Sequence, residues 1–320
     1  MSKNRAISGF WRRLIAFVID GLLLGLFGLI VGIFLFDFLA QLGGWGRLVG
    51  FCIAMGYFGL LNSFIGKGQT LGKRIMKIEV VGREGINISV GRSLVRYMIF
   101  AGPFFFNGLI IPPSITLSTI GYGIGFIIFA FGGSIIYLYI FNRRTRQSLH
   151  DLVVGTFVVR TNPKGEVTAS PMWNGHFVVV GIWFVVIFGL LVIAPIVSQK
   201  GIFPELFAVQ KSIQASGKVH VATVFVGKSW GSTGGETWET TYFSSNAIWK
   251  SRPDDFEVAA AQIAAIVLDE YSEIMQKDIL AVTVTYGYDI GIARAWRKWN
   301  VRHSPQEWIE ILGESGVEEK

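Results

Sequence analysis

Cysteine and histidine are both scarce. The 320 residues contain a single cysteine, Cys52, and four histidines. A lone cysteine forms no disulfide within the chain, so the fold must be held together by packing. The histidines stand far apart, and neither an HExxH pattern nor a pair of cysteines accompanies them, which argues against the usual metal sites. We therefore expect neither a metal site nor a cofactor.

Charge is scarce as well. Charged residues make up 16% of the chain, hydrophobic residues make up 51%, and the mean hydropathy of +0.49 is too high for an ordinary soluble protein. Each of five nearly uncharged runs can cross a hydrocarbon core of about 30 Å as a helix. These runs are 14–36, 48–65, 94–111, 120–141 and 177–198. They predict a mostly α-helical polytopic membrane bundle with about five transmembrane helices.

Basic residues predict the orientation of the bundle. Up to residue 176 the chain has 17 Lys and Arg against 6 Asp and Glu, whereas the remainder has 12 against 16. The excess lies in the N-terminal segment and in the loops at 66–93 and 142–176, which predicts a cytoplasmic N-terminus and a C-terminal domain outside. Because the excess flanks the spans, we do not expect nucleic acid as a partner.

The third run, 94–111, is the weakest candidate for a span. It contains Pro103 and Asn107 and leads into the pair Pro112-Pro113, so a segment that re-enters the membrane remains an alternative. The basic residues favour a full span. Without one, the arginines at 143–146 would lie outside, which the positive-inside bias disfavours.

Residues 199–320 have the alternating pattern of a soluble domain. The order ββαββα predicts a C-terminal α+β domain with an antiparallel sheet. Its strands are expected at 219–226, 238–243, 279–286 and 290–296, with helices at 253–275 and after the capping box 304–307. Most of the tryptophans should lie in the core or on the sheet, with an exposed partner-binding patch as the alternative. They are residues 230, 238, 249, 296, 299 and 308.

Two short motifs resemble those of enzymes, and neither fits. Residues 227–231 match G-x-S-x-G, but glycines follow where a nucleophile elbow must open a helix, so a glycine-rich hairpin loop is expected. Residues 66–74 resemble a phosphate loop, yet only three residues separate Gly68 from Gly72, and Arg74 stands where Ser or Thr is needed. The sequence therefore does not indicate an enzyme.

Three stretches of the first half together resemble the RDD family of membrane proteins. They are FWRRLIAFVID at 10–20, GQTLGKR at 68–74 with its continuation to RSLVRY at 92–97, and NRRTRQSLHDLVVGT at 142–156. Arg13 and Asp20 match the family's arginine and first aspartate, and Asp151 matches its second aspartate. The resemblance covers about 6–160. It implies a prokaryotic plasma-membrane or inner-membrane protein with a transport role, since some members look like cation/proton antiporters.

The resemblance and the apolar runs together divide the chain. We expect an RDD-like four-helix membrane domain at 1–160, a cytoplasmic linker at 161–176, a fifth transmembrane helix at 177–198 and an extracytoplasmic α+β domain at 199–320. The last two parts depart from the family pattern. The middle block provides a cytoplasmic signature loop, which consists of Gly68, Gln69, Thr70, Gly72 and Lys73.

Asp20 is the most informative residue of the first run. It stands six residues past the start of the run, which is about 9 Å into the hydrocarbon at about 1.5 Å per residue. A charge at this depth costs a few kcal/mol, so the carboxylate should face the bundle interior and have a partner. Arg13 shares its helix face but is about 10 Å away along the axis. We therefore expect a third group beside Asp20: Arg96, His150, water or a bound cation.

The predicted ion or structural polar cluster leaves two functions open. It consists of Arg13, Asp20, Arg96, His150 and Asp151. In one interpretation a desolvated carboxylate exchanges a proton for a monovalent cation. The protein then transports a small ion or solute, and its outer domain is a sensing or interaction domain. In the other, the cluster only pins the spans together, and the protein is a non-transporting scaffold or envelope-assembly factor whose outer domain binds a protein partner. Both place a multi-pass protein in the lipid bilayer of the cell membrane and leave a homo-oligomer open.

Overall fold

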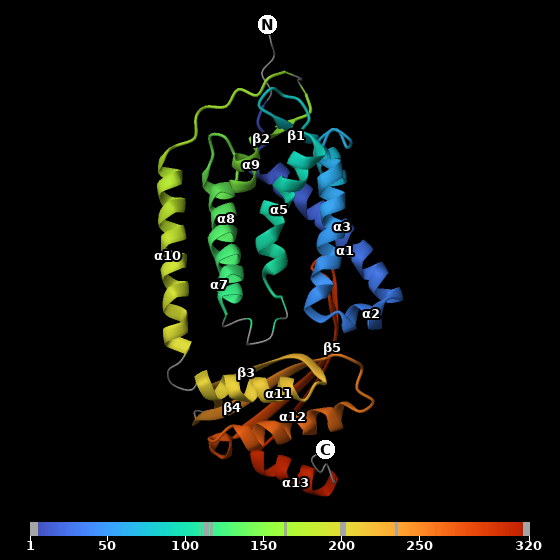
Figure 1. The fold of residues 1–320 in the computed structure, drawn as a ribbon, viewed down its shortest axis with the longest axis vertical. Coiled ribbons are helices and arrows are strands. Elements are labelled where there is room, and N and C mark those ends of the chain that lie inside the picture. Colours follow the sequence, from blue (N-terminus) through green and yellow to red (C-terminus); the bar gives the residue numbers. More distant parts are fainter. Residues whose placement is uncertain are drawn as a thin grey trace.

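The computed structural model describes residues 6–109, 111, 115, 118–162, 165–198, 203–233 and 236–315. Long helices form an elongated bundle, and a sheet covered by helices lies at one end of it (Figure 1). We call this the domain end of the bundle. The opposite end, where the N-terminal segment and the arginine-rich loops lie, is called the basic end.

Four helical stretches among the described residues are long and apolar enough to cross a membrane. They are Phe10–Phe34 (α1), Gly43–Leu61, Thr119–Phe141 and Gly175–Val197. The second contains α3 (Gly46–Leu61), the third contains α7 (Thr119–Phe126) and α8 (Gly132–Phe141) joined by a π-helical turn, and the fourth lies in α10 (Gly175–Ser198). By length and composition, these stretches confirm four of the five predicted membrane helices.

The burial pattern of α1 is that of a helix surrounded by lipid. Its buried positions include the small residues Ala16 and Gly28 and the carboxylate Asp20, whereas the large apolar residues Leu22 and Ile33 are exposed. In water this arrangement would be unfavourable. In a bilayer, where lipid tails are as apolar as leucine, small and polar residues form the contacts between helices.

The third predicted run forms α5 (Val90–Phe106), which is 17 residues long. Ser89 caps its first turn, and the helix ends soon after Pro103. Arg47, at the start of α3, donates from Nη1 to the carbonyl oxygen of Phe105 at 3.1 Å, so α5 ends at the domain end of the bundle. The helix therefore runs from one end of the bundle to the other and does not turn back (Figure 1). Pro112-Pro113 lies outside the described residues.

Short elements close the basic end. They are α4 (Leu71–Ile75), β1 (Ile78–Gly82), α9 (Leu149–Val154) and β2 (Thr156–Arg160). β1 and β2 pair antiparallel, with Val80 opposite Val158. This two-stranded ladder ties the signature loop to the segment that follows α8, and it holds α4 and α9 beside the ends of the long helices.

The C-terminal domain has the predicted ββαββα order with one helix added in front. The added helix is α11 (Phe203–Ala215). The others are β3 (Val219–Thr233), β4 (Glu236–Trp249), α12 (Phe256–Glu270), β5 (Ile279–Asp289), β6 (Arg294–His303) and α13 (Pro305–Ser315). Asp255 caps the first turn of α12, and its carboxylate accepts a hydrogen bond from the backbone N–H of Glu257 at 2.7 Å.

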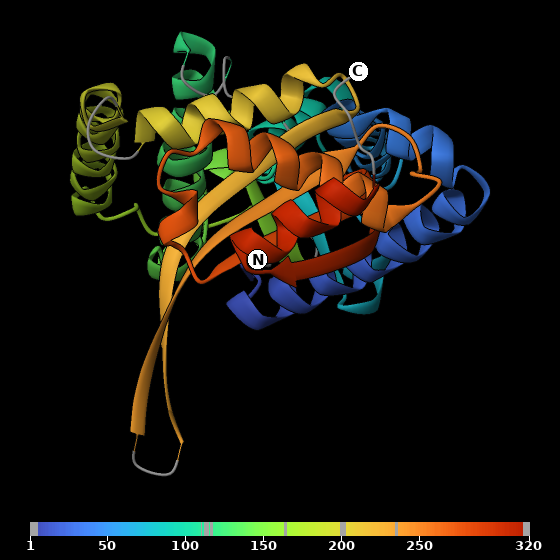
Figure 2. The same ribbon diagram turned by 90° about the horizontal axis from the view of Figure 1, so that it is seen from below.

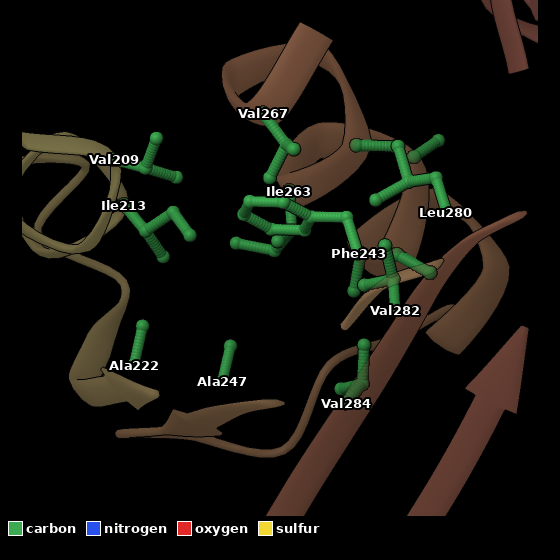
Figure 3. Close-up of a cluster of buried hydrophobic side chains, with 14 of the residues drawn as sticks. Val209, Ile213, Ala222, Phe243, Ala247, Ile263, Val267, Leu280, Val282 and Val284 are labelled. Atoms are coloured by element: carbon green, nitrogen blue, oxygen red, sulfur yellow. The ribbon is translucent and has the colours of Figure 1, made fainter. Parts of the chain in front are cut away.

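The sheet is mixed, which corrects the prediction of an antiparallel one. Its order is β3-β4-β5-β6, and β4 and β5 run parallel, with Phe243 opposite Leu280. The reason is that α12 carries the chain back to the end of the sheet where β4 began, as a helical crossover does. The helices pack on one face around Ile213, Phe243 and Ile263 (Figure 3).

Only part of the prediction for the tryptophans is correct. Trp249 and Trp308 are buried, and the indole nitrogen of Trp308 donates to the carbonyl oxygen of Leu280 at 2.9 Å. Trp230 and Trp238, in contrast, are 71% and 50% exposed. They lie on the long β3–β4 ribbon, which projects well beyond the rest of the molecule (Figure 2).

The turn between β5 and β6 reaches into the domain end of the bundle (Figure 1). We call residues 288–293 the hairpin tip. A Cβ on Gly32 would overlap the hydroxyl of Tyr288, and one on Gly50 would overlap the carbonyl oxygen of Ile290. Gly32 and Gly50 thus allow the hairpin tip to approach α1 and α3 closely, because a side chain at either position would collide with it.

Two polar contacts hold the hairpin tip and its strand in place. Arg47 Nη2 lies 2.6 Å from Asp289 Oδ2, and both side chains are largely buried. The hydroxyl of Tyr286 donates to Asp37 Oδ1, in α2 (Phe36–Gln41), at 2.6 Å. The membrane bundle and the C-terminal domain are thus joined by specific side-chain contacts.

Candidate functional site

Asp151 is the centre of a buried charged cluster at the basic end. Its carboxylate belongs to the capping box of α9, where it accepts from the backbone of Ser148 at 3.4 Å. Arg13 Nη2 lies 2.8 Å from Oδ2, and Arg96 Nε and Nη2 lie 2.9 and 2.8 Å from Oδ1. Thr156 donates a fourth side-chain hydrogen bond at 3.0 Å. Capping therefore positions the carboxylate, and two arginines from different helices meet it.

The cluster is more positive than negative. Burial alone would raise the pKa of the Asp151 carboxyl, but the neighbouring charges, led by Arg96, outweigh burial and hold that pKa well below its ordinary value. Asp151 is therefore ionised throughout the physiological range and does not carry protons. One carboxylate faces two arginines, so the group Arg13–Asp151–Arg96 bears a net positive charge.

Asp20 belongs to a separate group of contacts. It is fully buried and accepts hydrogen bonds from the hydroxyls of Thr70 and Tyr57, at 2.5 and 2.7 Å, and from the backbone of Gly72 at 2.8 Å. We expected a third group such as Arg96 or His150 beside Asp20. In the described part of the chain no cationic side chain forms an ion pair with it, and uncharged donors of the second span and the signature loop take that place.

The signature loop is built to dock against α1. Thr70 caps α4 by accepting from the backbone of Lys73 at 3.3 Å, and its hydroxyl donates to Asp20. A Cβ on Gly72 would overlap the carbonyl oxygen of Ala16, so only glycine lets α4 approach α1 this closely. Gly68 has a φ of +72°, which also favours glycine. Gln69 donates to the carbonyl oxygen of Ile78 at 2.9 Å, so Gly68, Gln69, Thr70 and Gly72 all help to shape or dock the loop.

Lys73, the fifth residue of the loop, points toward the charged cluster. Its ammonium donates to Asn62 Oδ1 at 2.8 Å and lies 5.9 Å from the centre of the Phe58 ring. Burial, followed by the charge of Arg96, lowers the pKa of Lys73 to about 7. Lys73 is therefore a group whose charge changes near neutral pH.

His150 is held beside Asp151 as a neutral ring. Its Nε2 lies 3.5 Å from Asp151 Oδ2, and the ring meets Phe100 edge to face. Burial lowers the pKa of His150 to about 3, so the imidazole stays uncharged. The other ring nitrogen, Nδ1, is buried and has no hydrogen-bond partner among the described residues. Buried polar atoms rarely remain unpaired, so Nδ1 is available to a hydrogen-bonding group that enters beside the ring.

One cavity adjoins the cluster, and a second cavity adjoins the first. The first, of about 260 Å³, is lined by Arg13, Lys73, Arg96 and His150 together with aromatic and aliphatic residues. Within the described part of the chain, every charged side chain in this lining is cationic. The second cavity, of about 610 Å³, is almost entirely apolar and extends to Ile292 in the hairpin tip. Both are lined by Phe17, Phe58, Tyr97, Phe100, Ile135 and Ile136.

Four of the five predicted cluster residues are thus brought together. Arg13, Arg96, His150 and Asp151 meet at the basic end, whereas Asp20 is held apart from them. The sequence did not point to Tyr57 and Asn62, which supply contacts to Asp20 and Lys73. The signal was available in principle, because a buried carboxylate needs several donors, and polar residues near a span end are candidates.

The G-x-S-x-G match of the C-terminal domain does not have the geometry of a nucleophile elbow. Ser229 of the G-x-S-x-G match lies within β3, opposite Thr240 of β4. The stretch is therefore regular strand and not the expected loop, and it lacks the strand-to-helix turn that a nucleophile elbow requires. No group of three or more His, Cys, Asp or Glu residues that could hold a metal ion is found within the residues that the structure covers.

The comparisons with known proteins concern the part of the chain that carries the cluster. Residues 7–155 match the model of the RDD family. The uncharacterized protein YxaI of Bacillus subtilis (strain 168) is 27% identical over 174 residues, a match that covers 48% of this chain and 96% of the relative. No solved structure matches the chain. Together with the four membrane helices, the match shows that residues 7–155 are an RDD family domain in a multi-span membrane protein.

Proposed function

We propose that the RDD domain binds a small charged solute at the basic end and moves it along the space between α1, α5 and α8. The pair of adjoining cavities is the observation that carries this proposal. One begins at Arg13, Lys73 and Arg96, and the other reaches the hairpin tip at the opposite end of the bundle. An internal path of this kind serves transport, whereas a protein that only pins membrane partners together gains nothing from it.

The cavity lining favours an anion over the cation that the family resemblance implies. Asp20 and Asp151 are the carboxylates a cation would need, and both are already bound by hydrogen-bond donors. A cation in the first cavity would instead face Arg13, Lys73 and Arg96, and like charges at short range repel strongly in a medium of low dielectric constant. An anion or acidic solute is therefore the proposed cargo, and cation/proton exchange is the less favoured form.

Lys73 gives this site a means of coupling to protons. Its pKa of about 7 means that only part of the population is charged near neutral pH. An anion bound beside Lys73 favours the ammonium form, so binding raises that pKa and takes up a proton. The proposed transport is accordingly proton-coupled, with the proton carried by Lys73 and not by Asp20.

The hairpin tip is proposed to close the far end of the path. Ile292 lines the second cavity, and the tip is wedged against glycines of α1 and α3. If the basic end is cytoplasmic, as the positive-inside bias predicts, the C-terminal domain lies outside and controls release or entry on that side. This gives the outer domain a regulatory role in transport.

Flux measurements in proteoliposomes test the proposal. Full-length protein is reconstituted, and the uptake of small anions and of monovalent cations is measured with and without a pH gradient. Lys73→Gln should lower anion uptake roughly tenfold, the factor that corresponds to loss of an interaction of about 1.4 kcal/mol. Lys67→Gln is the matched control, since Lys67 is an exposed lysine of the same loop. Equal uptake by both variants would refute a role for Lys73, and absence of flux for every ion would refute transport.

The projecting ribbon favours a second function, the binding of a protein partner. Phe225, Trp230 and Trp238 are 59%, 71% and 50% exposed and lie on the β3–β4 ribbon (Figure 2). Exposed tryptophans are enriched at the centres of protein interfaces. Cross-linking in intact cells, with and without Trp230→Ser, tests this function. Loss of a specific cross-linked partner in the variant is the expected result, and an unchanged pattern would refute the assignment.

A further inference from the structure

We propose that the cavity ligand is an anionic amphiphile with a hydroxyl-bearing headgroup and an acyl chain, of the kind found in acidic phospholipids. The headgroup lies beside Lys73 and His150, and the chain fills the apolar cavity between α5 and α8. This inference rests on the proposed function, because it names the chemical class of the molecule that enters the same cavity. Three separate features of the lining support it.

The first feature is the charge of the headgroup region. Among the described residues that line the first cavity, Arg13, Lys73 and Arg96 are the charged ones, and all are cationic. Lys73 has an uncharged partner, Asn62, so its ammonium has no carboxylate bound directly to it among the described residues. Basic pockets between membrane helices on the cytoplasmic side suit acidic lipid headgroups. An anionic group here meets a positive charge that the protein itself leaves uncompensated.

The second feature is the unpaired nitrogen of His150. Nε2 faces Asp151 at 3.5 Å, which favours a hydrogen on that nitrogen and leaves Nδ1 as an acceptor. His150 is only 3% exposed and lines the first cavity, and its Nδ1 has no hydrogen-bond partner among the described residues. A halide or sulfate ion has no hydrogen to donate to this atom. A headgroup hydroxyl does, so the ligand carries one.

The third feature is the size and polarity of the second cavity. It measures about 610 Å³, and binding sites for small molecules are typically about 300–1,000 Å³ and mostly apolar. The two cavities share six aromatic and aliphatic residues, so the apolar space begins where the cationic lining ends. A small inorganic anion would leave this space empty, and a purely apolar molecule would not use the cations. An amphiphile satisfies both parts.

The position of the site along the bundle fits a lipid in a membrane leaflet. Lys73 belongs to α4 at the basic end, where the long helices leave the membrane, and the second cavity extends from there toward the hairpin tip. A headgroup at the first cavity therefore lies at the level of neighbouring headgroups. Its chain points into the bilayer interior, as the chains of surrounding lipids do.

Lipid retention by the full-length protein provides the test. Protein purified in detergent is mixed with phosphatidylglycerol, phosphatidic acid or phosphatidylcholine, and retained lipid is counted by native mass spectrometry. We expect phosphatidylglycerol to be retained best, because it has both the charge and the hydroxyls. Lys73→Gln should lower retention roughly tenfold, which is one decade in the dissociation constant, and Lys67→Gln should leave it unchanged. Equal retention of phosphatidylcholine would overturn the proposal.

Two further variants separate a specific site from lipid on the bundle surface. Ile136 lines both cavities and is 62% exposed, so Ile136→Trp fills the cavity mouth without disturbing a packed core. Ile33 is 75% exposed, and Ile33→Trp is its control. Retention should fall in the first variant only. His150→Phe should remove the preference for phosphatidylglycerol over phosphatidic acid, and equal behaviour of both tryptophan variants would overturn the proposal.

Flux data on the same variants distinguish failure of this inference from failure of the proposed function. Retention of phosphatidylglycerol without any anion flux supports the lipid site and refutes transport. Flux of small anions that Ile136→Trp leaves unchanged, with no lipid retained, refutes the lipid site and supports transport.

Discussion

Replacing Asp151 by asparagine removes the one carboxylate that two buried arginines share. Asp151 is fully buried, and the Arg13 and Arg96 side chains are 7% and 10% exposed. Asparagine has nearly the same shape, so the change is one of charge rather than of packing. It leaves two guanidinium groups close together without a counter-charge, and the new amide group points donors at a site that already holds donors.

The expected cost follows from the burial of the pair. Breaking a buried ion pair by removing one partner typically destabilises a protein by about 3–5 kcal/mol, because an uncompensated charge remains buried. Asp20→Asn is the matched control at another fully buried aspartate. Its three donors are uncharged, so we expect about 1–3 kcal/mol, the penalty for leaving a buried polar group without its partner.

Thermal denaturation of the full-length protein in detergent measures both effects. At roughly 2–4 °C per kcal/mol for a domain of about 150–250 residues, Asp151→Asn should lower Tm by roughly 10 °C, and Asp20→Asn by clearly less. The double variant Arg13→Met with Asp151→Asn should recover part of the loss, since it removes one unpaired charge. A Tm for Asp151→Asn equal to or above that of Asp20→Asn would refute the description of the cluster.

Three further changes test other parts of the structure. Gly72→Ala places a Cβ against the α1 backbone and should destabilise the protein by about 1–3 kcal/mol in the same denaturation assay. In the control variant Gly56→Ala the added Cβ meets nothing within 4 Å, so stability should not change. Equal effects of the two variants would contradict the docking of the signature loop on α1. In Gly50→Ala the added Cβ would collide with the carbonyl oxygen of Ile290 and should displace the hairpin tip. A protease should therefore cut the β5–β6 turn faster in this variant than in the parent protein. An unchanged cleavage rate would show that the tip is not wedged against α3. The pKa of Lys73 is about 7 in the folded protein, whereas the ordinary value is 10.5. Between these two pH values Lys73 is protonated in the unfolded chain and neutral in the folded protein. Raising the pH removes this proton from the unfolded chain, so the free energy of unfolding should rise from about pH 7 to about pH 10.5. Arg96, Asp20, Arg13 and Asp151 act on the Lys73 charge from the neighbouring helices. Because Lys73 loses its charge above pH 7, anion binding should weaken there. Lys73→Arg should abolish both the rise in stability and the loss of anion binding. If the pH profiles of this variant and the parent protein were identical, Lys73 would not be the group that titrates.

The membrane helices could be predicted because their cause is local. Each apolar run contains its own signal, and four of the runs form helices of sufficient length among the described residues. The weakness of the signal in the run at 94–111 has an equally local cause. Pro103 limits α5, and the helix ends at Phe106, so its length falls below that of the others.

The partners of the buried charges could not be predicted because they are distant in the sequence. Arg13 and Asp151 are 138 residues apart, and Asp20 and Gly72 are 52 residues apart. The cost of burial indicates that Asp20 needs donors, but it does not distinguish an arginine from a hydroxyl or a backbone amide. That choice depends on how α4 docks on α1, which only the three-dimensional structure shows.

The same limit explains the errors in the C-terminal domain. Alternating residues identify strands but do not set which strand lies beside which, so the parallel pairing of β4 and β5 was missed. Most of the tryptophans were expected in the core or on the sheet. Trp230 and Trp238 do lie on strands, but β3 and β4 extend past the helices that cover the sheet as a two-stranded ribbon, which leaves both side chains exposed (Figure 2).

Ion selectivity of the reconstituted full-length protein tests the central claim most directly. The cationic lining around Lys73 predicts uptake of an anion that depends on Lys73 and is accompanied by protons, with Asp20→Asn affecting stability more than selectivity. Exchange of a monovalent cation for protons that persists in Lys73→Gln and disappears in a folded Asp20→Asn protein would contradict it.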